Sequence, residues 1–156
     1  LAARAALPPG FDPSAYRIIP ARPTRLLNEG DEVDLGGRTL RALHTPGHTP
    51  GHVAFFDRAN GILFTADVAY CGPMFLCFEE CDPAAFARSV RRLAALQGVK
   101  LLCPGHEAII SNSGWLAELA ERVDAALAGQ LRGEAHDGFL RGRHVRFDGY
   151  SIWLPL

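Results

Sequence analysis

Three of the six histidines stand at intervals of four residues, at His44, His48 and His52. Two Pro-Gly steps separate them, so the segment cannot be helical, and a helical metal site with ligands four residues apart is excluded. Each Pro-Gly step turns the backbone sharply and leaves it little conformational freedom. We therefore expect a tight loop between two strands that aims the imidazole of His48 in a fixed direction.

Two further side chains that bind metals follow short apolar runs. Asp67 comes directly after Leu63–Ala66, and His106 follows Pro104-Gly105 at the end of another apolar run. Functional groups are commonly exposed at strand ends in α/β folds. With His48 they make two imidazoles and one carboxylate, the N and O ligands that zinc accepts, and a carboxylate can also bridge two ions. Three protein ligands leave a position open for water.

Other histidines and the cysteines have simpler interpretations. His44 and His52 flank the loop, and structural roles at strand ends are favoured over hydrogen bonding to ligands or contact with substrate. His136 and His144 lie in a polar segment and are expected at the surface. The cysteines are expected to be small buried hydrophobic residues rather than a zinc cluster; they are Cys71, Cys77, Cys81 and Cys103.

The elements that must position these residues begin after an irregular lead-in, because residues 1–24 contain five prolines. A first hairpin is predicted from Glu32–Leu35 and Arg38–Leu43 across two glycines. A second hairpin joins His52–Phe56 to Ile62–Ala66 across Asn60-Gly61, a strong turn signal. The loop of His48 connects the two hairpins.

Two helices and further strands follow. Asp82 is the expected N-cap of the first helix, which ends near Gly98. Leu101–Cys103 is predicted to be a buried strand. Ser111 or Ser113 is expected to cap a second helix, and His144–Leu154 is expected to form a hairpin around Asp148-Gly149. The apolar stripe of the second helix is predicted as Leu116, Leu119, Val123 and Leu127. This order predicts a layered α/β or α+β domain.

Composition narrows the functional classes. The chain has 156 residues, 48% of them hydrophobic, enough for one domain spanning 1–156. A net charge of −1 gives no field that would attract nucleic acid or a membrane surface. No run of apolar residues approaches the length needed to span a membrane. The cysteines lack disulfide spacing, which favours a cytoplasmic location. Because it opens on Leu1 without a signal peptide, the sequence is expected to begin inside a longer protein.

Three strings of residues closely resemble the third, fourth and fifth motifs of the metallo-β-lactamase superfamily. They are Thr-Pro-Gly-His-Thr-Pro-Gly at 45–51, Leu-Phe-Thr-Ala-Asp at 63–67 and Pro-Gly-His-Glu at 104–107. The resemblance covers about residues 29–107 and implies the αββα-type layered fold of that family. The family more often has Gly-Asp where this chain has Ala66-Asp67, but the carboxylate is kept.

The resemblance also implies roles for the three residues. His48 would complete a first zinc site, Asp67 would bridge two metals and His106 would belong to a second site, with one or two zinc ions in the complete protein and iron or manganese as alternatives. The family's His-x-His-x-Asp-His motif, which supplies most of the other ligands, is absent from these 156 residues. The chain therefore resembles the C-terminal portion of the family's domain, incomplete at its N-terminus.

The function implied is hydrolysis of a thioester, lactone or related ester of small size by a metal-bound hydroxide, with His48 and Asp67 at the reacting centre. Tyr70–Pro73 and Asp148–Ile152 resemble a branch of the family that includes thioester and ester hydrolases. The segment Tyr70–Phe78 is expected to line an apolar substrate pocket, to belong to the core, or to pack on the missing half. Two alternatives stay open: an iron persulfide-dioxygenase-like enzyme, and a truncated non-catalytic remnant whose exposed half-core is covered in a homodimer.

Overall fold

Five strands form the larger, mixed sheet of the computed structural model, which describes residues 8–111 and 114–156. Its strand order is β1-β2-β3-β4-β6, with antiparallel pairs except for the parallel pair β4 and β6. The bounds are β1 Glu32–Asp34, β2 Thr39–His44, β3 Val53–Asp57, β4 Ile62–Ala66 and β6 Leu101–Pro104. Both predicted hairpins and the predicted buried strand are therefore confirmed to within a residue or two at their ends.

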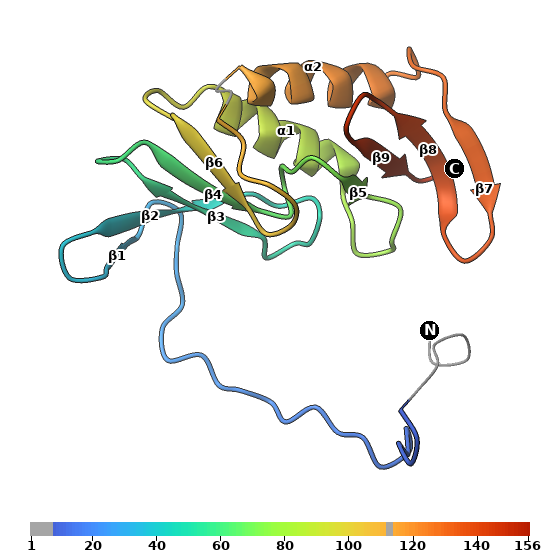
Figure 1. Ribbon diagram of the computed structural model, residues 1–156, viewed down its shortest axis with the longest axis horizontal. Coiled ribbons are helices and arrows are strands. Elements are labelled where there is room, and N and C mark those ends of the chain that lie inside the picture. Colours follow the sequence, from blue (N-terminus) through green and yellow to red (C-terminus); the bar gives the residue numbers. More distant parts are fainter. Residues whose placement is uncertain (1–7, 112–113) are drawn as a thin grey trace.

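Two helices pack against each other and lie together over one side of the sheets (Figure 1). Helix α1 spans Pro83–Ala94, and its predicted N-cap is confirmed because the Asp82 side chain accepts a hydrogen bond from the amide of Ala85. Helix α2 spans Trp115–Leu127 with Gly114 at the N-cap position. The predicted cap at Ser111 is therefore wrong, and the alternative, Ser113, lies outside the described residues.

The smaller sheet contains strands that the sequence analysis only partly anticipated. Its order is β5-β9-β8-β7, formed by β5 Pro73–Phe75, β7 Glu134–Asp137, β8 Arg141–Arg146 and β9 Ser151–Leu154. The hairpin of β8 and β9 was predicted, whereas β5 and β7 were not. Strand β5 pairs in parallel with β9, so the segment that follows Asp67 is joined to the last strand of the chain.

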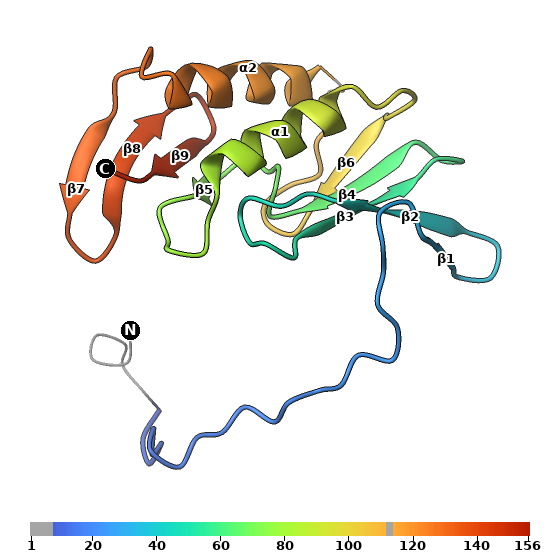
Figure 2. The ribbon, with the colours of Figure 1, turned by 180° about the vertical axis from the view of Figure 1, so that it is seen from behind.

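The core lies between the larger sheet and the helices. Residues from alternate positions of β2, β3, β4 and β6 point toward Phe86, Val90 and Leu93 of α1. Of the predicted stripe on α2, Leu116, Leu119 and Val123 are buried, but Leu127 is exposed. In both views the helices cover only one side of this sheet (Figure 2).

The opposite face of the larger sheet is apolar and only partly covered. Cross-strand partners there form rows such as Phe55, Phe64 and Cys103. The half-buried apolar residues of this outer face are Val33, Leu40, Val53, Phe55, Ile62, Phe64, Leu101 and Cys103. We call these residues the outer face.

The proline-rich lead-in leaves the body of the molecule. Residues 8–27 form no helix or strand, as predicted, and run away from the sheets (Figure 1). Within the described residues, neither helix has the length and apolar character needed to cross a membrane.

Candidate metal centre

The loop that carries His48 joins β2 to β3 and is fixed against the start of α1. Gly47 has φ +138°, and a Cβ atom there would lie 2.3 Å from both the Cα and the backbone nitrogen of Phe86. The amide of Asp82 donates to the Gly47 carbonyl over 2.8 Å. Only glycine permits both this conformation and this approach, so the Pro46-Gly47 step places His48.

A backbone carbonyl orients the imidazole of His48. Its Nδ1 lies 3.0 Å from the carbonyl oxygen of Phe75 in β5. Because that oxygen can only accept, Nδ1 carries the proton, and in the neutral ring Nε2 is left with a lone pair. Nε2 lies 3.8 Å from Oδ2 of Asp67. A ligand histidine in a metal site is oriented in the same way.

Asp67 directly follows β4, and His52 holds its backbone. Ala66 has φ +45°, a left-handed conformation that costs less for glycine, which explains physically why Gly-Asp is the commoner pattern. The amide of Asp67 donates to Nε2 of His52 over 3.2 Å, so Nδ1 of His52 donates to the Thr45 hydroxyl over 2.7 Å. Burial lowers the pKa of His52 and keeps its ring neutral. His52 therefore has a structural role, but it has that role through a hydrogen bond to the backbone of a candidate ligand, the alternative that was not favoured.

His106 comes to Asp67 through the parallel pairing of β4 and β6. Ala66 pairs with Pro104, and the Gly105 amide donates to the Ala66 carbonyl over 3.0 Å, which brings the two strand ends together. Nε2 of His106 lies 3.2 Å from Oδ1 of Asp67. His106 is exposed to solvent and its ring lies 5.4 Å from that of Tyr70.

The three predicted residues thus converge, with the Asp67 carboxylate between the two imidazoles and one imidazole near each of its oxygens. Two nitrogens and a carboxylate suit zinc, so the donor chemistry fits the metal that the resemblance implies. Across 8–111 and 114–156, however, no group of three or more His, Cys, Asp or Glu side chains is arranged so that it could hold a metal ion. The three side chains are thus suited to be part of a site, and their metal binding stays a prediction.

A cavity of about 320 Å³ opens over these residues. It is lined by His48, Asp67, Tyr70, Pro73, Phe75, His106 and Glu107. Burial, reinforced by the charges of Asp67 and Glu107, raises the pKa of Tyr70 to about 12, so its phenol stays protonated and donates to the Pro73 carbonyl. Three residues of the segment Tyr70–Phe78 therefore line the cavity, whereas Met74 and Leu76 of the same segment are buried in the core.

Several contributing residues escaped the sequence analysis. Phe75 orients His48 through a backbone atom, which no side-chain pattern can reveal. Glu107 was seen only as part of a motif. His136 and His144 were expected at the surface, but both are half-buried beside Trp153, and the ring of His144 stacks on its indole at 4.2 Å.

Comparison with known proteins agrees with this geometry. The model of the metallo-beta-lactamase superfamily matches residues 2–106. An acyl-coenzyme A thioesterase, MBLAC2, from Gallus gallus is 38% identical over 101 residues, which cover 63% of this chain and 36% of that protein. A hydroxyacylglutathione hydrolase from Chelativorans sp. (strain BNC1) is 39% identical over 114 residues, which cover 65% and 43% of the two chains.

A solved structure gives the same answer for the fold. The metallo-beta-lactamase family protein TTHA1429 from Thermus thermophilus aligns with a TM-score of 0.62 and 29% identity, over 72% of this chain and 39% of that one. This chain belongs to the metallo-beta-lactamase superfamily and has an α/β fold of that type. It spans about two fifths of the length of the two curated relatives described above.

Proposed function

We propose that this chain is the C-terminal portion of a metal-dependent hydrolase of small thioesters. The observation that carries the proposal is the placement of Asp67 between His48 and His106 at the wall of an open cavity. Membership of the superfamily and the names of the relatives, a thioesterase and a hydroxyacylglutathione hydrolase, favour thioesters over lactones and other esters.

His48, Asp67 and His106 would hold the metal, with further ligands from outside these 156 residues. A zinc ion held there supplies a Lewis acid and a bound water of lowered pKa. The carboxylate of Asp67 would accept a hydrogen bond from the attacking water and so fix its direction toward the thioester carbonyl. The carbonyl of Phe75 keeps Nε2 of His48 directed toward Asp67, and Tyr70, protonated at neutral pH, closes one wall of the cavity.

The test is metal analysis and a substrate panel on the full-length gene product that carries these residues. We expect zinc in the purified protein and turnover of thioesters above lactones and simple esters. Asp67→Asn and His106→Ala should each lower metal content and abolish turnover. His136→Ala, a histidine of the smaller sheet away from the cavity, is the matched control and should change neither.

Other outcomes would indicate a different function. Iron in place of zinc, with oxygen uptake on a persulfide, would replace the hydrolase by the oxygenase alternative. A metal-free product, or a metal-loaded product inert on every thioester, lactone and ester, would end the proposal.

The outer face favours a second, non-catalytic candidate for the chain in isolation. Eight half-buried apolar residues on one sheet face are the type of surface that associates. We propose that the 156 residues alone form a homodimer through this face, whereas in the full-length product other residues cover it. Light scattering should find the isolated chain larger than a monomer, and Phe64→Lys should make it monomeric; a stable monomer without the substitution would refute this.

A further inference from the structure

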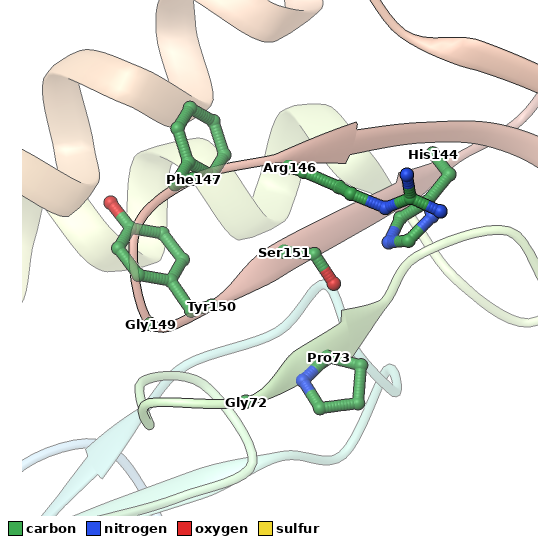
Figure 3. A pocket seen from close by; sticks show the side chains of 8 residues that line it. All are labelled: Gly72, Pro73, His144, Arg146, Phe147, Gly149, Tyr150 and Ser151. Atoms are coloured by element: carbon green, nitrogen blue, oxygen red, sulfur yellow. The ribbon is translucent and has the colours of Figure 1, made fainter.

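A second cavity, of about 310 Å³, adjoins the candidate metal centre, because Pro73 lines both. It lies between the start of β5 and the β8–β9 hairpin (Figure 3). It is lined by Gly72, Pro73, His144, Arg146, Phe147, Gly149, Tyr150 and Ser151. No acidic residue is among these eight, so the wall itself offers a cation and hydrogen-bond donors; the one carboxylate paired with that cation belongs to Glu134, which does not line the cavity.

Ser151 supplies a hydroxyl that lacks a protein partner. The residue is only 8% exposed, and its amide donates to the Gly72 carbonyl over 3.1 Å, which fixes its backbone. Its hydroxyl points into the cavity (Figure 3), and it has no hydrogen bond within 8–111 and 114–156. Both ring nitrogens of His144, which lines the same cavity, are buried and likewise lack a partner among the described residues. A buried polar group without a partner is costly, so the nitrogens of His144 favour a polar ligand in the cavity, and the Ser151 hydroxyl is free to donate to it.

Arg146 supplies the positive charge at the same cavity (Figure 3). Its Nη1 lies 3.3 Å from each carboxylate oxygen of Glu134, while Nε and Nη2 have no partner among the described residues. Both side chains of this pair are more than half exposed, so the pair is weak and an incoming anion can compete with it. Burial lowers the pKa of the neighbouring His144, which leaves Arg146 as the cation of the cavity.

We propose that this second cavity binds an oxyanion, a carboxylate or a phosphate, that the substrate carries away from its reacting carbonyl. Arg146 and Ser151 would donate to the oxyanion while the carbonyl lies across Pro73 in the cavity of His48 and Asp67. Arginine forks and hydroxyl donors match the acceptor geometry of both anions. The assignment to a substrate rests on the proposed hydrolase function, but binding of the anion does not.

The binding test uses this chain without metal. Inorganic phosphate and propionate are titrated separately while the amide signals of Ser151 and Gly149 are followed by ¹⁵N NMR. We expect saturable shifts with at least one anion, and the anion that binds more tightly identifies the class. Arg146→Gln should weaken binding about tenfold, as expected for the loss of a charged hydrogen bond, and Ser151→Ala by a smaller factor.

Two further variants make the test specific. Arg141→Gln is the matched control, because Arg141 lies on the same strand, is largely exposed and pairs with Asp137 instead. Glu134→Gln should tighten binding, since it removes the competitor of the anion. Absence of saturable shifts, or equal affinity in Arg146→Gln and the unsubstituted chain, would overturn the proposal.

The catalytic test uses the full-length product and matched thioesters. S-acetyl-3-mercaptopropionate carries a carboxylate on the thiol side of the thioester, and a succinyl thioester of a neutral thiol carries one on the acyl side. Each compound is compared with the matching compound in which a carboxamide replaces the carboxylate. At least one carboxylate should have the lower KM, and Arg146→Gln should remove that difference, whereas the control Arg141→Gln should leave both kcat and KM as they are in the unsubstituted enzyme. Equal KM values in both pairs would overturn the substrate assignment. Anion shifts without any hydrolysis would refute the hydrolase function and leave the anion site standing.

Discussion

Gly47→Ala should destabilise the protein far more than the same substitution four residues later. At Gly47 a Cβ atom would lie 2.3 Å from backbone atoms of Phe86, and φ is +138°. The unfavourable φ costs about 1–3 kcal/mol, and overpacking adds about 1–3 kcal/mol. We therefore expect a loss of about 2–6 kcal/mol in the free energy of unfolding, or a fall of about 4–24 °C in Tm.

The neighbouring Pro-Gly step provides the control for this prediction. A Cβ atom at Gly51 would have open space for 4 Å beyond its adjacent residues, and φ there is not positive. Gly51→Ala should therefore stay within about 0.5 kcal/mol of the unsubstituted chain. Urea denaturation followed by tryptophan fluorescence measures both variants. If Gly47→Ala also unfolded within about 0.5 kcal/mol of the parent, the account of how the His48 loop is fixed would be wrong.

Three more predictions concern single contacts, one at the site and two elsewhere in the fold. His52→Ala should lower the free energy of unfolding by about 1–3 kcal/mol in urea denaturation, because two buried groups lose their partner; an unchanged midpoint would contradict this. The Asn60 side chain lowers the pKa of Asp57 in the folded protein. Asp57 therefore adds stability at pH values above its pKa in the unfolded chain, and this stability is lost as the pH falls through its pKa in the folded protein. Asn60→Ala should raise that pKa in a carbon NMR titration, and a constant value would refute the assignment. Arg91 and Asp124 join the helices at 2.6 Å on the surface, so a double-mutant cycle should give a coupling of about 0.2–1 kcal/mol, and a value above roughly 2 kcal/mol would refute its surface character.

Local chemistry made much of the fold predictable. Asn60-Gly61 and the two glycines before Arg38 specify hairpin turns, and Asp82-Pro83 specifies a helix start, so these elements appear where the sequence places them. Strands β5 and β7 could not be predicted in this way. Each is short and has no pattern of its own. Strand β5 exists because the distant β9 pairs with it, and β7 is held by its hairpin pairing with β8 rather than by a turn signal in the sequence.

The candidate site, too, was predictable from the sequence only in part. His48, Asp67 and His106 were selected by residue type and by their positions after turns and strands, and the structure brings them together. The support of His48 by the Phe75 carbonyl and that of Asp67 by His52 depend on contacts between elements far apart in the chain. Ser151 lies in the string 148–152 that resembles a branch of the family, but neither it nor Arg146 was predicted to bind a ligand, because their cavity forms only where β5 pairs with the β8–β9 hairpin.

That pairing also sets an order of events during synthesis. Pro73 of β5 finds its partner in Ser151 of β9, so β5 cannot be fixed until the ribosome has delivered β9. The carbonyl that directs His48 belongs to β5, and contacts of such long range form late and slowly. The larger sheet can therefore assemble on the nascent chain, while the direction of its candidate ligand is decided only after β9 has emerged from the ribosome.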